Sequence, residues 1–137
     1  MITNAAITIY NRKRKGRESV LLPTVIKDAS WFYGRRAARG QFIDNEDSYQ
    51  VRIPYGADTS GKTYISAKGY VALTEQEAAG YWTIQVDDFV LMGEYTTAMS
   101  DERDIKALTD DQFVVNNFAD NTIRGSDAVK HWRIGGL

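Results

Sequence analysis

The residues of this sequence that could do chemistry are one histidine, His131, and two pairs of adjacent aspartates. The chain has no cysteine, so a metal site would need His131 with several carboxylates, and no HExxH, HxH or DxDxDG spacing is present. The pairs Asp87-Asp88 and Asp110-Asp111 cannot flank one scissile bond, because adjacent residues of a strand point to opposite faces. There is also no G-x-S-x-G, P-loop or G-x-G-x-x-G motif. We therefore expect no catalytic residue, metal site or cofactor, and we expect that the protein is not an enzyme.

A strongly basic segment, YNRKRKGRES, occupies residues 10–19 and follows the alternating apolar run AAITI. The simplest interpretation is the solvated tip of a β-hairpin, with Gly16 supplying a positive φ. The functional interpretation is a contact with DNA phosphates or with an acidic partner, made by charge and not by sequence readout. The residues of this docking or DNA-facing tip are Arg12, Lys13, Arg14, Lys15 and Arg17.

The charge of the chain is unevenly distributed, although the net charge is only -1. Residues 1–40 hold nine Lys or Arg against two acids, and the remainder holds eight against sixteen. Such asymmetry is typical of a polyanion contact or of complementary faces on stacked subunits. The sequence shows no secretion signal and no apolar run long enough to span a bilayer, so we expect a soluble intracellular chain without a membrane partner.

Aromatic residues gather in apolar contexts such as SWFYG and GYWTI, where packing in a core is the usual outcome. A base-stacking platform would instead need aromatics beside basic residues on one exposed sheet face. We therefore expect core positions for most of this set, which consists of Trp31, Phe32, Tyr33, Tyr81, Trp82 and Trp132.

Short apolar runs between turn residues predict a mainly β fold, a small barrel or sandwich with long loops, forming one domain over residues 1–137. We expect strands or short apolar runs at residues 5–9, 20–28 (weakened at Pro23), 29–34, 49–55, 63–66, 70–73, 81–86, 89–95, 112–118 and 128–136. A hairpin or sharp corner is expected at residues 87–88, a long loop at 35–48 and a turn at 56–62.

Two helical segments have capping signals. Residues 100–109 form the best helix candidate, since Ser100 or Asp101 can cap it and Ile105 and Leu108 share a face. A single helical turn is expected after Thr74, which has a glutamate three residues later, as in a capping box.

Three blocks of the sequence are more specific than the rest: ITNAAITIYNR (2–12), GYWTIQVDDFVLMGE (80–94) and DAVKHWRIGGL (127–137). In order and spacing they resemble a family of short proteins encoded by tailed phages and prophages, chiefly of Gram-positive bacteria. Members of that family open with T-N-A-x-(I/V)-T-(I/V)-Y-N, carry Y-W-T-(I/L)-x-x-x-D-x-(I/V)-x-x-G-E, and end in R-H-W-x-V-G-G. Lys130 and Ile134 stand where this pattern has Arg and Val. The matching residues include Tyr81, Trp82, Asp88, Gly93, Glu94, Trp132, Gly135 and Gly136.

The arrangement is also similar to that of head-closure, or stopper, proteins of the phage neck. The resemblance implies a structural protein of the virion, made in the cytoplasm of the bacterial host, that forms a ring between the portal or adaptor and the tail. Its implied partners are the portal or adaptor ring, tail proteins, further copies of itself and packaged double-stranded DNA in the lumen. The segments 35–48 and 56–62 are candidates for loops between subunits or facing the lumen.

Other functions stay open at this point. Within the virion, the chain could be a tail-terminator or tail-completion protein, or a minor capsid component. From a different class, a small nucleic-acid-binding β-barrel without sequence specificity fits the basic tip.

Overall fold

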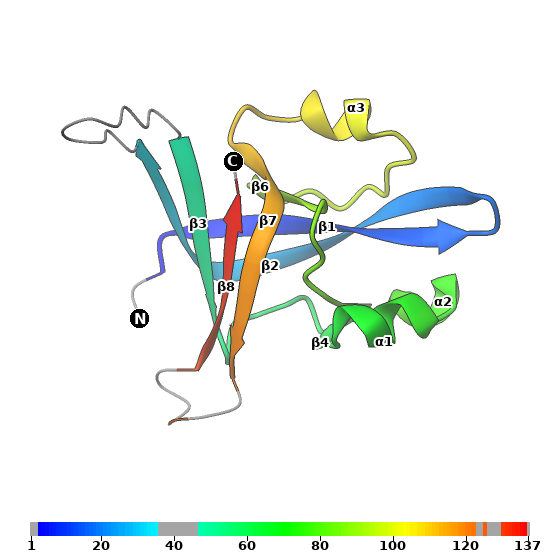
Figure 1. The fold of residues 1–137 in the computed structure, drawn as a ribbon, viewed down its shortest axis with the longest axis horizontal. Helices are drawn as coiled ribbons and strands as arrows, with labels where there is room; N and C mark the ends of the chain where they lie inside the picture. Colours follow the sequence, from blue (N-terminus) through cyan, green and yellow to red (C-terminus); the bar gives the residue numbers. More distant parts are fainter. Residues whose placement is uncertain (1–2, 36–46, 123–124, 126–129, 137) are drawn as a thin grey trace, which may run out of the picture.

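The computed structural model describes residues 3–35, 47–122, 125 and 130–136, and this part of the chain forms a closed, antiparallel, six-stranded β-barrel (Figure 1). The expected mainly β fold is confirmed as a barrel. Its strands, in barrel order, are β1 (Ala5–Lys15), β2 (Glu18–Arg35), β3 (Asp47–Pro54), β8 (His131–Gly136), β7 (Gln112–Asn121) and β6 (Phe89–Met92).

A small parallel pair and three short helices complete the described elements. The pair consists of β4 (Thr63–Tyr64) and β5 (Tyr81–Trp82). The helices are α1 (Ala67–Ala72), α2 (Glu75–Ala78) and α3 (Glu102–Lys106). None of the helices in the described ranges is long and apolar enough to cross a membrane.

The hairpin of β1 and β2 extends beyond the barrel wall. β1 pairs with β6 only over residues 7–10, and from there to the turn it pairs with β2 alone. At the turn, Gly16 has a positive φ of 62° and Arg17 has a negative φ. This combination is found in a type II′ turn. In Figure 1 this arm extends to the right, with α3 above it and α1 and α2 below it.

β2 is one continuous strand where the sequence predicted two segments. Pro23 lies opposite Tyr10 in the ladder, and two residues earlier the Leu21 N–H bonds the Met99 carbonyl, on the side away from β1. The nitrogen of Pro23 faces that same outer side, so the β1–β2 ladder needs no N–H from it. The strand therefore passes through the proline without a break.

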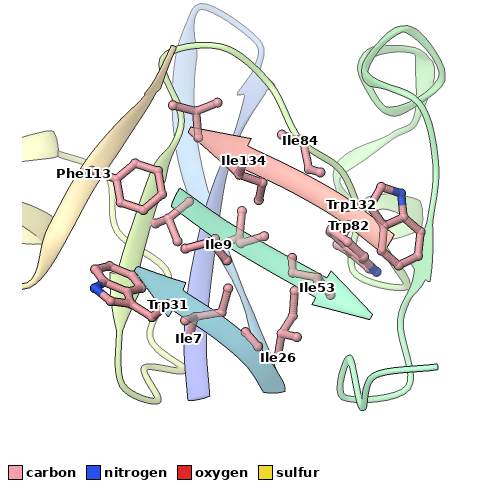
Figure 2. Close-up of a cluster of buried hydrophobic side chains, with 14 residues drawn as sticks. Ile7, Ile9, Ile26, Trp31, Ile53, Trp82, Ile84, Phe113, Trp132 and Ile134 are labelled. Carbon is pink, nitrogen blue, oxygen red and sulfur yellow. The ribbon is translucent and has the colours of Figure 1, made fainter. Parts of the chain in front are cut away.

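The barrel interior is filled with apolar side chains. Isoleucines from β1, β2, β3 and β8 form its middle, between Trp31 and Phe113 at one end and Trp82 and Trp132 at the other (Figure 2). Side chains of this size fill a barrel of so few strands. The core is thus a packed one.

Two local expectations need correction. The apolar run at residues 70–73 lies mostly in α1, where Tyr70 is the buried member, and the strand expected at 63–66 is reduced to β4. At residues 87–88, where a hairpin or a sharp corner was expected, the structure has the corner, because β5 pairs with β4 while β6 belongs to the barrel. Asp87 adopts a φ of 76° at this corner.

The capping signals are confirmed. Thr74 and Glu77 form the reciprocal capping box of α2, and the Asp101 side chain accepts from the Arg103 N–H at the start of α3. α3 is shorter than expected, but Ile105 is fully buried. Of the long loop expected at 35–48, residues 36–46 lie outside the described residues.

Candidate docking site on the β1–β2 hairpin

Lys13 fixes the hairpin to α1 and is not part of the solvated tip. Its side chain is only 4% exposed, and Nζ donates to the carbonyls of Tyr70 at 3.1 Å and Val71 at 3.0 Å. These carbonyls belong to the last turn of α1, where the Tyr70 carbonyl also accepts the N–H of the C-cap residue Leu73 at 3.1 Å. Nζ also lies 5.6 Å from the centroid of the Tyr70 ring. The expectation that Lys13 belongs to the exposed basic tip is therefore wrong.

Arg12 fixes the opposite flank of the hairpin. Its half-buried guanidinium pairs with Glu102 at the start of α3. Its backbone N–H donates to Asp88 Oδ1 at 3.1 Å, and its carbonyl accepts from Gln85 Nε2 at 3.2 Å. The hairpin is thus held between α1 on one side and α3 on the other.

The base of the hairpin is held by a buried polar network around Asp88. This carboxylate is 2% exposed and accepts three hydrogen bonds, from Asn11 Nδ2 at 2.9 Å, Gln85 Nε2 at 2.9 Å and the Arg12 N–H. Burial raises the pKa of Asp88 to about 6, because desolvation outweighs the hydrogen bonds that favour the ionised form. Asn11 also donates to the Thr83 carbonyl at 2.7 Å and accepts from the Thr83 N–H at 3.2 Å.

The outer part of the hairpin exposes basic side chains. Arg14 and Arg17 are exposed, whereas only the backbone of Lys15 is described. A groove of about 380 Å³ lies beside Arg14, and its apolar walls include Val71, 67% exposed, and Val86, 53% exposed. Its other lining residues are Arg12, Lys13, Ser19, Gln85, Asp87 and Asp88. A basic rim beside exposed apolar side chains suits the docking of a macromolecule better than the binding of a small ligand.

The residues of the three sequence blocks hold the barrel together. Trp82 and Trp132 are in edge-to-face contact, with ring centroids 5.0 Å apart. Gly93 has a φ of 113°, its N–H bonds the Ala6 carbonyl at 2.9 Å, and its own carbonyl accepts from Thr8 Oγ1 at 2.8 Å. Together with the Asn11–Asp88 bond, these contacts join the first block to the second and the second to the third.

The two terminal glycines of the third block allow β8 to pack closely on β7. A Cβ at Gly136 would lie 2.1 Å from the Val114 carbonyl oxygen, and one at Gly135 would lie 2.6 Å from Asn117 Oδ1. The remaining two block residues are less enclosed, since Tyr81 is half-buried in β5 and Glu94 is exposed.

The histidine lies away from the hairpin, at the start of β8. His131 Nε2 is 3.3 Å from Asn121 Nδ2 across the β7–β8 ladder. Within the described ranges, no three His, Asp or Glu side chains gather where they could share a metal ion.

Sequence reasoning missed the burial of Lys13, although a signal was present. The alternation that places Ile7 and Ile9 inside continues through Asn11 to Lys13, all of which are buried. No comparable signal identified Val71 and Val86, because the groove forms only when α1 and the corner at 85–88 come together beside the hairpin.

Comparison with known proteins places the chain in a family. No curated protein and no solved structure matches it. The model of one protein family, DUF6751, described as a family of unknown function, matches residues 2–137. Because this match includes the hairpin, the barrel and all three sequence blocks, the chain belongs to the DUF6751 family.

Proposed function

We propose that the protein is a structural component of a tailed-phage neck that closes the head or connects it to the tail, as part of a ring between the portal or adaptor and the tail. It performs no catalysis in this role. The observation that carries the proposal is the basic arm formed by β1 and β2, which projects past the barrel and is held on both flanks. The resemblance of the three sequence blocks to phage proteins supports the same role.

The arm has the properties of a docking element. Lys13 and Arg12 hold it in place, so the exposed Arg14 and Arg17 are presented on a rigid hairpin and not on a flexible loop. A ring built from identical copies needs two different surfaces on each copy, joined head to tail. A projecting basic arm can reach a neighbouring ring or packaged DNA, and both contacts would depend on charge.

The experiment is disruption of the gene in the genome that carries it, followed by induction and electron microscopy of the lysate. Empty heads beside free tails of normal length would support head closure. Overlong tails would instead indicate a tail terminator. Intact, infectious virions would refute a structural role in the virion.

Complementation tests the arm itself. The disrupted strain is supplied with the wild-type gene, with Arg14→Glu, or with Lys27→Glu as a matched control, since both residues are exposed on strands. We expect wild type and Lys27→Glu to restore infectious particles and Arg14→Glu to fail, although all three chains fold. Equal restoration by Arg14→Glu would remove the arm from the proposal.

A further inference from the structure

The outer face of β2, β3 and β8 exposes two arginines and a phenylalanine. Arg52 on β3 lies directly opposite Arg133 on β8, and among the described residues neither forms an ion pair. Like charges that face each other across a ladder are unfavourable in the isolated chain. An acidic partner would relieve this repulsion.

Phe32 makes the same face apolar as well as basic. It lies one outward-facing row from Arg52 in the ladder and is 62% exposed, so it is an exception to the core packing expected for most of the aromatic residues. Its ring lies over Gly34, where a Cβ would come within 2.8 Å of Cε1. A groove of about 290 Å³ runs here, lined by Ser30, Phe32, Gln50 and Arg52. Exposed aromatic and arginine side chains around a groove are the composition of protein–protein interface anchors.

The segment that contains α3 lies on the other side of the barrel. Ile105 packs against Tyr10, Leu21, Phe89 and Leu91, from β1, β2 and β6. In the closed strand order, β6 lies across from β3 and β1 lies across from β8. The α3 segment and the Arg52–Arg133 face are therefore on opposite sides of one protomer.

The α3 segment is acidic where the other face is basic. Residues 101–111 contain five acids and two basic residues. Glu102 and Asp101 are paired within the chain, with Arg12 and Arg103. The exposed acids that remain are Asp104, Asp110 and Asp111, beside Lys106. Asp28 on β2, two residues before Ser30, is exposed beside Lys27 where the β1–β2 register shifts.

We infer that the Arg52–Arg133 face binds a second copy of this chain, which presents its α3 segment, so that copies join head to tail. Complementary charge on opposite sides of one protomer produces a heterologous contact, which gives a closed ring if the rotation permits. This inference rests on the proposed ring and assigns the two surfaces that form it.

Charge exchange tests the contact directly. One variant carries Arg52→Glu and Arg133→Glu, a second carries Asp104→Arg and Asp110→Arg, and a control carries Lys27→Glu and Lys68→Glu outside both surfaces. We expect self-association, measured by analytical ultracentrifugation at low salt, to weaken about tenfold or more in each of the first two variants, since like charges then meet across the contact. The control should associate like wild type. An equimolar mixture of the two weakened variants should associate again, because their altered surfaces complement each other.

Cross-linking gives a second readout that detects weak association. The chain has no cysteine, so Arg52→Cys with Asp110→Cys places one thiol on each surface. A bifunctional maleimide should then give a ladder of multimers on a denaturing gel, whereas either single cysteine should stop at dimers. The inference would be overturned if the wild-type protein stays monomeric even at high protein concentration. It would also be overturned if the mixture of the two charge variants does not associate.

Two further outcomes separate this inference from its alternatives. If Arg52→Glu with Arg133→Glu instead abolishes binding of a fluorescent oligo(dT), the face binds nucleic acid and the inference is wrong. If gene disruption gives the neck phenotype but this variant restores infectious particles, the neck role stands and only the assigned interface fails.

Discussion

Trp82 of β5 and Trp132 of β8 meet edge to face at one end of the barrel, with Tyr64 packed against both. Two blocks that are far apart in the sequence thus form one aromatic group. This contact, the Asn11–Asp88 hydrogen bond and the Thr8–Gly93 hydrogen bond explain, as contacts within the fold, why many residues of the three sequence blocks are present. The surfaces that would contact partners lie largely on other residues, such as Arg14, Phe32 and the α3 segment.

Trp82→Ala should lower the free energy of unfolding by about 3 to 5 kcal/mol, because it leaves a cavity between Tyr64 and Trp132. Thermal and urea denaturation measure the loss. The exposed Val86 supplies a control in the same segment, and Val86→Ala should stay within about 0.5 kcal/mol of wild type. Equal effects of the two changes would show that Trp82 is not a core residue.

The buried Asp88 should make stability depend on pH in an unusual direction. The pKa of Asp88 is raised from 3.8 to about 6, so the folded state disfavours the ionised carboxylate. The resulting loss of stability is fully present above pH 6 and disappears as the pH falls below the unfolded pKa of 3.8. As the pH falls from 7 to 4, wild type should gain about 2 kcal/mol relative to Asp88→Asn, most of the roughly 3 kcal/mol that a shift of this size implies. Urea denaturation of both proteins across this range measures the difference.

The comparison with Asp88→Asn isolates this group from the other titrating residues. The exposed Asp87 provides a matched control, since Asp87→Asn removes a charge next to Asp88 but none of the hydrogen bonds that Asp88 accepts. A stability difference between wild type and Asp88→Asn that is the same at pH 4 and pH 7 would contradict the assignment.

Lys13→Met should destabilise the protein by about 1 to 3 kcal/mol, because the Val71 and Tyr70 carbonyls lose the Lys13 donor and only the Tyr70 carbonyl keeps the Leu73 N–H, while the length of the side chain is kept. Hydrogen exchange should also become faster in α1. Arg14→Met, one residue further along the same strand but exposed, should leave both stability and exchange nearly unchanged. The reverse order of effects would mean that Lys13 is an ordinary residue of the tip.

Gly136→Ala should cost about 1 to 3 kcal/mol or prevent folding, since its Cβ would overlap the Val114 carbonyl and separate β8 from β7. Gly56→Ala is the control, because a Cβ there meets nothing within 4 Å. The soluble yield and melting temperature of the two variants measure the effect. If Gly136→Ala is as stable as Gly56→Ala, close packing of β8 on β7 does not require glycine at position 136.

How far the sequence predicts this fold depends on whether the deciding interaction is local. Strand alternation correctly placed Ile7 and Ile9, and side-chain to backbone caps correctly placed Thr74 and Asp101, because each signal lies within a few residues. In SWFYG, three aromatics in a row fit both phases of a strand, and only pairing with β3 places Trp31 inside and Phe32 outside.

The candidate site was predicted only in outline for the same reason. The basic composition indicated a charged hairpin, but the partners of Lys13 are backbone carbonyls of α1, which no residue type in the sequence reveals. The groove and the Arg52–Arg133 face likewise depend on which strands become neighbours.

The continuity of β1 and β2 from the barrel wall to Gly16 has a consequence for recognition. Because the arm and the wall are the same two strands, the tip is ordered before any partner arrives, and little conformational entropy is lost when it binds. Variants at Arg14 and Arg17 should act mainly on the association rate and its salt dependence, because exposed charges steer the encounter, while variants that loosen the Asn11–Asp88 anchor should add the cost of ordering the arm on binding.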